Sequence, residues 1–398
     1  MKNIVENIIK VSIKTGKIKI KSKYLEPIIA KENYTTADIK MILEEMLDEM
    51  CGVDTLIAEI AKKVDNCNIK NIYLPYKMSI GIEIESEGKY GKLIYRMTDI
   101  LENGWECKGE STISNDAVEV VSPILHGDNV EDSKSIANVC GKLKGFGQCI
   151  SKYCGGHIHI GADYLATFNS WKNLLELIGN TEKNLFIMSN KAGEIISPER
   201  IKYAVPISRN IEKILKNNNL NINNIGDIKN VLKRAQGNDR NDINLNEKRY
   251  YSVNFLNVDE RLNTVEFRMA NGTLDYDTWV DNVQLFGGII KAAQNLAIAQ
   301  SVNDNNRTDK QKMMLNVFSK IKSKDISEDE KQELLLSLVV PLERRNIYRE
   351  RYIINSKLLE HNDEIKRIID GNTAKEPIDL SNNFLELLQS ELNSDMEI

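Results

Sequence analysis

The sequence predicts an α+β protein whose curved, largely antiparallel sheet carries helices on its outer face. Three stretches, 81–85, 154–161 and 264–269, alternate ionisable or polar residues with apolar ones, which is the period of a β-strand. Segments such as 279–290 place apolar residues at helical spacing, and a helix of this kind packs its apolar stripe on a sheet. The ionisable side chains should therefore share one face of the sheet while helices cover the other.

The composition argues against several classes of protein. A net charge of −5 gives no general reason for binding nucleic acid. The six cysteines include no Cys-x-x-Cys pair, which favours reduced thiols and a cytoplasmic location. No apolar run reaches the length of a membrane span, and the first residues lack the apolar core of a signal peptide. We therefore predict a cytoplasmic protein without nucleic-acid or membrane partners.

Two extensions are predicted to flank a central domain of residues 76–302. In the N-terminal extension, residues 1–75, alternation over 11–20 predicts a lysine-rich β-hairpin, and an apolar stripe over 35–63 predicts a helix. The C-terminal region, residues 303–398, is predicted to be helical. These two ends could select a macromolecular substrate or form a homo-oligomer.

Within the central domain, turn and cap residues separate the predicted elements. Pro123 ends one strand because it has no N–H to donate to the sheet. Strands are expected over 78–85, 118–123, 154–161, 249–256 and 264–269. Helices are expected over 89–102, 130–145, 170–189 and from 275 or 277 onward.

The stretch 154–161 contains His157 and His159, two of the four histidines in the chain. At i and i+2 of a strand, the two imidazoles share one face, and the isoleucines that alternate with them share the other. Glycines on both sides let the backbone turn tightly or let a ligand approach. One interpretation is a zinc or iron site with Cys154 as the third ligand, and the other is a share in an acidic site.

Glutamates repeat the i, i+2 design on two other strands. Glu83 and Glu85 share one face of their strand, and Glu266 is followed by Arg268 on another. Carboxylates gathered on one face repel one another strongly at low dielectric, so they require bound cations or shifted pKa values. Oxygen ligands favour Mg²⁺ or Mn²⁺. Two further candidates for this acidic site are Glu110 and Glu119.

Arg268 brings a planar set of donors to the same face. A guanidinium suits a phosphate or a carboxylate, and its pairing with a cation site indicates phosphoryl chemistry. The sequence contains no Walker-type glycine loop and no Rossmann glycine fingerprint. The alternative is that Glu266 and Arg268 only form a structural ion pair.

Four motifs occur in a characteristic order. They are Gly81-x-Glu-x-Glu85, Glu119-Val-Val-Ser-Pro123, Gly156-His-Ile-His-Ile-Gly161 and Thr264-Val-Glu-Phe-Arg-Met-Ala-Asn-Gly-Thr273, with Arg249-Tyr-x-x-x-Asn254 between the last two. In this order they resemble the amidoligase family of the carboxylate–amine ligase superfamily, which includes glutamine synthetase and glutamate–cysteine ligase. The resemblance covers residues 76–300.

The resemblance implies a glutamine synthetase-like catalytic fold and an ATP- and Mg²⁺-dependent ligase. In such an enzyme the γ-phosphate of ATP activates a carboxylate as an acyl phosphate, and an amine then displaces the phosphate. The carboxylate and the amine could each belong to a small molecule, a peptide or a protein side chain. The sequence leaves their identity open.

The resemblance also implies roles for individual residues. His159 would contact the nucleotide phosphate, and Arg268 would hold the transferring phosphoryl group, so that with Glu266 they form the catalytic set. Arg249 and Asn254 would be further nucleotide or substrate contacts. The cation ligands would be Glu83, Glu85, Glu119, His157, Glu266 and Glu110, the last in a segment, 108–112, where relatives commonly have an aspartate before Gly-Ser.

Two other functions fit the same residues. One is a different phosphotransferase of the same architecture. The other is a catalytically silent protein that has kept the fold in order to bind a peptide or a partner.

Overall fold

A computed structural model describes residues 69–70, 72–88, 91, 94, 101–114, 116–216, 222–237 and 250–380 of the chain. The predicted hairpin over 11–20 and the predicted helix over 35–63 lie outside these residues. The division into extensions and a central domain therefore stays a prediction.

The described strands form one seven-stranded sheet in the order β2-β3-β1-β5-β7-β6, with β4 paired to β1. Every pair of these strands is antiparallel, which confirms the predicted α+β class and antiparallel sheet. The strands are β1 (Ser79–Glu87), β2 (Glu106–Gly109), β3 (Ala117–Val121), β4 (Leu125–His126), β5 (Gly155–Gly161), β6 (Val253–Asn254) and β7 (Thr264–Asn271).

The alternation in β1 sorts its side chains between the two faces of the sheet. Ile80, Ile82 and Ile84 are buried in the hydrophobic core. Glu83 lies between them in sequence and is half-buried on the opposite face. Since β1 and β5 occupy the middle of the sheet, the polar face of these two strands is flanked by neighbours on both sides.

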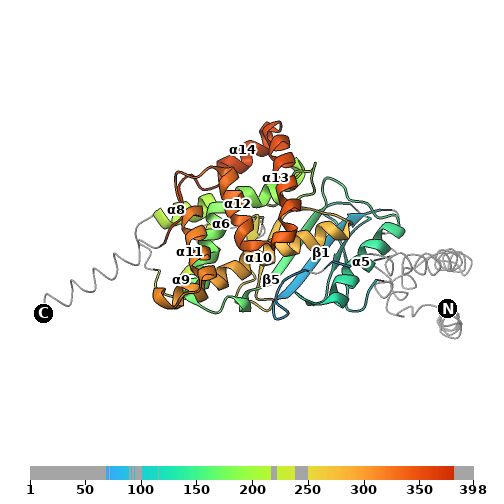
Figure 1. Ribbon diagram of the computed structural model, residues 1–398. Helices are drawn as coiled ribbons and strands as arrows, with labels where there is room; N and C mark the ends of the chain where they lie inside the picture. The colour runs from blue at the N-terminus through green and yellow to red at the C-terminus, as the bar shows by residue number, and fades with distance from the viewer. Residues whose placement is uncertain are drawn as a thin grey trace, which may run out of the picture.

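The apolar face is covered by α10 (Tyr276–Ser301) and α6 (Phe168–Met188). The approach of α10 requires Gly156, because a Cβ there would lie 2.9 Å from the ring of Trp279. Asn173 ties the two helices together by donating to the carbonyl of Ala293 at 3.1 Å. Figure 1 shows α5 at one end of the described molecule and α8, α9 and α11 at the other.

The other described α-helices are α5 (Val130–Gly145), α7 (Pro198–Ile201), α8 (Ser208–Lys216), α9 (Ile225–Ala235), α11 (Asp309–Ile321), α12 (Glu328–Val339), α13 (Arg345–Glu360) and α14 (Asp363–Asn372). The range predicted for α5 is confirmed, and its first turn is capped by Asn129, whose side chain accepts from two backbone N–H groups. Of the helix predicted over 89–102, Gly91 and Ile94 are described as helical, and most of the rest lies outside the described residues. Among the described residues, none of the helices combines the length and apolarity that crossing a membrane requires.

The strand predicted over 249–256 is reduced to β6. Side chains take the place of a sheet partner for the backbone that follows it. The N–H of Phe255 donates to Gln236 at 2.8 Å, and the N–H of Leu256 donates to Asn254 at 3.0 Å. Because these donors are already satisfied, the segment leaves the sheet after Asn254.

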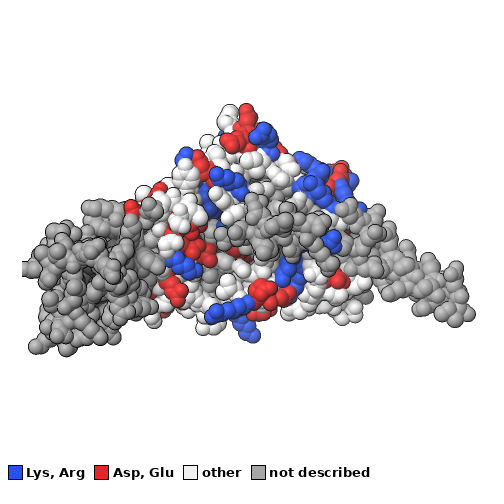
Figure 2. All heavy atoms as spheres, turned by 180° about the vertical axis from the view of Figure 1, so that it is seen from behind, with Lys and Arg blue, Asp and Glu red and all other residues white. Residues whose placement is uncertain are grey.

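The C-terminal helices share their core with the rest of the molecule. Phe318, Leu335 and Tyr348 belong to the same cluster of buried residues as Ile82 of β1 and Phe286 of α10. Seen from behind, the described surface carries basic and acidic side chains in mixture (Figure 2). The shared cluster of buried residues means that the described part of the predicted C-terminal region packs directly on the central helices.

Leu74 provides a test of how far this core extends towards the N-terminus. It is 2% exposed, and its side chain occupies the space beside Gly287 of α10. We expect Leu74→Ala to lower the free energy of unfolding by about 2–4 kcal/mol, because it removes buried methyl groups and leaves a cavity. Urea denaturation measures this change. The control is Leu262→Ala, at a position 64% exposed, which should change the free energy of unfolding by less than about 0.5 kcal/mol. Equal effects of the two substitutions would contradict the packing of Leu74 in the core.

Candidate active site

The polar face of the sheet is centred on the pair formed by β1 and β5. Glu83 lies opposite His157 in the register of the two strands. Nδ1 of His157 is 2.9 Å from Oε2 of Glu83, and Nε2 of His159 is 3.2 Å from Oε1 of the same carboxylate. One carboxylate therefore contacts both imidazoles, as expected when both i, i+2 pairs face the same side.

Strand β7 adds Glu266 and Arg268 to this centre. Glu266 lies opposite His159 in register, and its Oε1 is 3.8 Å from Nδ1 of His157. Arg268 donates from Nη1 to Oε1 of Glu266, and Asn254 donates to Oε2 at 2.7 Å. The ion pair predicted as the structural alternative is present, and it lies within the cluster.

Glu119 of β3 reaches the centre from the other side, since it lies opposite Glu85 in register. Burial and the negative charge of Glu83 raise the pKa of Glu119 to about 7, although Lys108 opposes the shift from 3.8 Å. The carboxylate is thus poorly compensated by the protein's own cations. A bound cation would provide that compensation.

Two sets of three side chains could each hold a metal ion. One consists of Glu83, Glu119 and His157, and the other of Glu83, His159 and Glu266; in each set the ligand atoms lie within 4.8 Å of one another. Carboxylate oxygens dominate both sets, which fits Mg²⁺ or Mn²⁺. Nε2 of His159 is buried and faces Oε1 of Glu83 at 3.2 Å, so this nitrogen lies among the atoms that a cation would approach.

Hydrogen bonds and nearby positive charge inside the cluster hold two carboxylates in their charged form. Burial alone would raise the pKa of Glu83, but its hydrogen bonds with His157 and His159 outweigh burial and lower it. Burial alone would also raise the pKa of Glu266. The positive charge of Arg268 opposes burial, and the net shift of the Glu266 pKa is downward. Burial lowers the pKa of His159, yet Glu83 and Glu266 reverse that effect and raise it. The centre therefore combines charged carboxylates with a partly neutralised Glu119.

Three predicted site residues need separate mention. Glu110 belongs to neither three-ligand set, and its Oε1 accepts from the backbone N–H of Thr112 at 3.0 Å. This bond closes a local turn and occupies one oxygen. Asn254 contacts Glu266, so it supports the cluster directly. Arg249 lies outside the described residues.

The zinc or iron interpretation required Cys154 beside the histidines. Among the described residues, neither three-ligand set includes this cysteine. Its Sγ lies 3.5 Å from Oγ of Ser151, and burial raises the pKa of the thiol. A thiol held in its neutral form is a poor metal ligand, so the geometry favours a hard cation.

Arg200 is a member of the site that the sequence did not indicate. It extends from α7, is 4% exposed, and places Nη2 3.2 Å from Nε2 of His157 and Nη1 3.6 Å from Oε2 of Glu85. A Cβ at Gly155 would lie 2.1 Å from its Nη2. The only sequence signal was the helix start at Ser197-Pro198, which carries no information about what Arg200 contacts.

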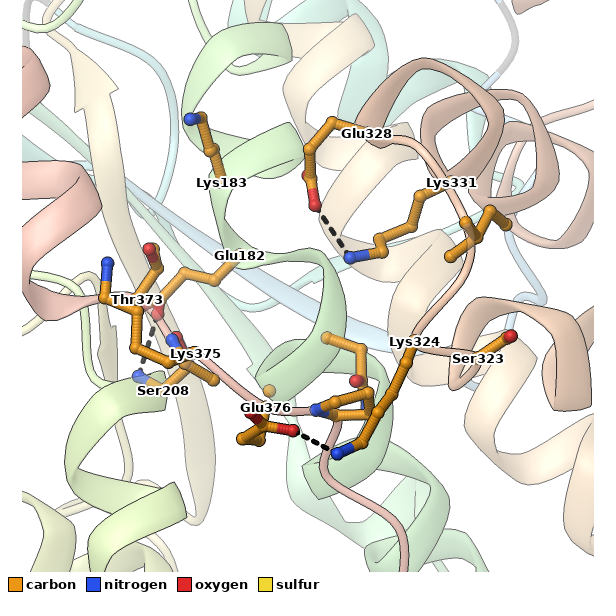
Figure 3. Close-up of a pocket in the computed structure, with 15 residues that line it drawn as sticks. Glu182, Lys183, Ser208, Ser323, Lys324, Glu328, Lys331, Thr373, Lys375 and Glu376 are labelled. Carbon is orange, nitrogen blue, oxygen red and sulfur yellow. Dashed lines mark hydrogen bonds and ion pairs between the residues drawn. The ribbon is translucent and has the colours of Figure 1, made fainter.

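Figure 3 shows a cavity of about 320 Å³, whose lining residues include none of the carboxylate–histidine cluster. It is lined by α6, α12 and the segment around Lys375. Three of its four lysines are paired with acids, namely Lys183 with Asp370, Lys324 with Glu376 and Lys331 with Glu328. Pairing of this kind neutralises most of the charge in the cavity, so the candidate active site stays with the cluster.

Glu119→Gln tests the electrostatics of the cluster. The folded-state pKa of Glu119, about 7, exceeds its ordinary value of 4.5, so the ionised group destabilises the fold increasingly as pH rises through this window. In EDTA at pH 8 we expect Glu119→Gln to raise the free energy of unfolding by about 1–2 kcal/mol. At pH 4 the difference should vanish. Urea denaturation at both pH values measures this difference. A variant less stable than the wild type at pH 8 would contradict the prediction that ionised Glu119 destabilises the fold.

Comparison with known protein families gives a match to this chain. The model of a family described as "Putative amidoligase enzyme" matches residues 83–290, which is more than half of the chain. The matched segment begins at Glu83 and includes β5 and β7. No curated protein matches the chain.

Proposed function

The chain belongs to the amidoligase family, and from this membership we propose that it is an ATP- and Mg²⁺-dependent ligase. It would join a carboxylate to an amine through an acyl phosphate, on a glutamine synthetase-like form of the α+β fold. Mn²⁺ could replace Mg²⁺. A cytoplasmic location is part of the proposal, and it is supported by the four described cysteines, which are all free.

The observation that carries the proposal is the charge balance of the buried polar face. Four glutamates, at 83, 85, 119 and 266, lie beside two buried arginines, two histidines and the exposed Lys108, yet the pKa of Glu119 is still raised to about 7. A purely structural network would match its charges, because unpaired buried charges are costly. A carboxylate whose charge the protein compensates poorly supports a site that takes up divalent cations together with a polyphosphate.

Each residue of the site would have a distinct role. Glu83, Glu85, Glu119 and Glu266 would hold Mg²⁺, which when bound would neutralise charge on the nucleotide phosphates. Glu266 fixes one side of the Arg268 guanidinium, so that the remaining donors of Arg268 would stabilise charge that develops during phosphoryl transfer. Asn254 keeps Glu266 in place.

A trapping experiment tests the proposal. An acyl phosphate is electrophilic, so hydroxylamine should convert it to a hydroxamate while ADP and phosphate are released. The protein would be incubated with ATP, Mg²⁺, hydroxylamine and a pool of carboxylates that includes amino acids and peptides. Mass spectrometry would identify the hydroxamate. Release of AMP and pyrophosphate would indicate adenylation, a phosphorylated guanidine would favour the phosphotransferase, and ATP binding without turnover would favour the silent binding protein.

Arg268→Lys tests the role of the guanidinium. Lysine keeps the positive charge but loses the planar set of donors. We expect hydroxamate formation to fall about 100-fold, while the affinity for ATP with Mg²⁺ changes by less than about threefold. Arg209→Lys, on the partly exposed helix α8, is the control. An equal loss of affinity and turnover would place Arg268 in nucleotide binding alone.

A further inference from the structure

We propose that Gln236 is a positioning residue of the site, which acts through Asn254 to hold the Glu266 carboxylate in the direction of the bound cation. The three side chains form a continuous set of hydrogen bonds from the end of α9 to β7, and each of the three residues is at most 4% exposed. The inference rests on the proposed function only for the presence of a divalent cation.

A backbone donor fixes the orientation of the Gln236 amide. The N–H of Phe255 donates to Oε1 of Gln236 at 2.8 Å, and a backbone N–H can only donate. The side-chain oxygen must therefore face Phe255. The amide nitrogen is then the group that faces Asn254, and Nε2 donates to Oδ1 of Asn254 at 2.9 Å.

Two donors in turn fix the orientation of Asn254. The N–H of Leu256 donates to Oδ1 of Asn254 at 3.0 Å, and Nε2 of Gln236 donates to the same oxygen. The nitrogen Nδ2 therefore faces Glu266, where it donates to Oε2 at 2.7 Å. If the Asn254 amide turned over, its N–H groups would oppose both donors and its oxygen would oppose the carboxylate. Gln236 thus stabilises the one orientation in which Glu266 receives a hydrogen bond from Asn254.

This orientation determines how Glu266 can serve a cation. Arg268 donates to Oε1 of Glu266 and Asn254 donates to Oε2, so rotation of the carboxylate would break both bonds. Each carboxylate oxygen has two lone pairs and keeps acceptor capacity for a cation. Glu266 is a member of one of the three-ligand sets. Residues that orient metal ligands from behind in this way are worth about 10- to 100-fold in metal affinity.

The fold holds both amides in place. Asn254 lies directly opposite Glu266 in the register of β6 and β7. Gln236 caps the C-terminus of α9, where its backbone N–H donates to the carbonyl of Lys233 at 3.2 Å. The next residue, Gly237, has a φ of +81°, the left-handed conformation that ends many helices. Because α9 buries its apolar face in the core, a rigid element presents the Gln236 side chain to β6.

Isothermal titration of the full chain with Mn²⁺ tests the proposal by a double-mutant cycle. We expect Gln236→Met to weaken Mn²⁺ binding about tenfold, because Asn254 loses a donor that orients it. In the Asn254→Ala background, Gln236→Met should change the affinity by less than about twofold, since no amide remains to be oriented. The control is Gln332→Met, which replaces a buried glutamine beside Met188 and should change Mn²⁺ affinity by less than about twofold.

Two results of this titration would overturn the proposal. One is a folded Gln236→Met with the Mn²⁺ affinity of the wild type. The other is a pair of effects, from Gln236→Met and Asn254→Ala, that multiply in the double variant, because independent packing defects combine in that way.

Neutron diffraction from wild-type crystals grown in D₂O with EDTA needs neither a variant nor a cation, so it decides the amide orientations even if Gln236→Met fails to fold. We expect deuterons on Nε2 of Gln236 that face Oδ1 of Asn254, and deuterons on Nδ2 of Asn254 that face Glu266. The reverse orientation of Asn254 would overturn the proposal. A wild-type chain that takes up no Mn²⁺ would instead count against the proposed function, and the amide orientations would still show whether Gln236 positions Glu266.

Discussion

Glu83→Ala should abolish the stabilisation of the protein by ATP with Mg²⁺ and reduce turnover by about 1,000-fold. Glu83 is the one residue common to both three-ligand sets, and it contacts both imidazoles. In the wild type, ATP with Mg²⁺ should raise the melting temperature, because a ligand that binds the folded chain stabilises it by mass action. EDTA should remove that shift. In Glu83→Ala the shift should be absent with or without EDTA.

The control for this variant is Glu106→Ala, a glutamate in the edge strand β2 that is exposed to solvent. It should retain the full shift. Differential scanning fluorimetry measures both variants, and isothermal titration with Mn²⁺ measures cation affinity directly. A thermal shift in wild-type protein that persists unchanged in EDTA would mean that nucleotide binding does not depend on a cation.

The sequence predicts the parts of the fold that depend on local periodicity. The alternation in 81–85 and 154–161 identifies β1, β5 and the face that each side chain occupies, since a strand has a period of two residues. Strands β2 and β4 were not predicted. They have four and two residues, which is too short for a period to be visible, and they exist because β3 and β1 offer them a partner.

The candidate site also contains residues that the sequence predicts and one that it does not. The i, i+2 pairs at Glu83 and Glu85 and at His157 and His159 are visible in the sequence, and their convergence follows from pairing β1 with β5. Arg200 could not be predicted. It is separated from His157 by 43 residues, and its contact depends on how α7 meets the sheet. No pattern within a single element records such a contact.

Asp281→Ala should lower the free energy of unfolding by about 3–5 kcal/mol, the largest effect on stability that we expect. Asp281 of α10 is 3% exposed and accepts from Arg344 and, at 2.7 Å, from Arg351. Tyr348 donates to its carbonyl oxygen at 2.6 Å. Burial raises the pKa of Asp281 in spite of both arginines, so the intact network contributes little net stability. Its loss is still costly, because alanine leaves two guanidinium groups buried without this carboxylate.

The position of these residues also makes Asp281→Ala a test of how the C-terminal helices relate to the sheet. Arg351 of α13 bonds to Asn282 at 3.0 Å and to the carbonyl of Met188 at 3.2 Å, so it joins α13 to α10 and α6. If these helices share one cooperative core, urea denaturation of Asp281→Ala should show a single transition at lower urea concentration. Asp277 lies on the same helix as Asp281 and forms a partly exposed ion pair with Lys70. Asp277→Ala should therefore lower the free energy of unfolding by less than about 1 kcal/mol. Two separate transitions in Asp281→Ala would show instead that residues 303–380 fold independently of the sheet.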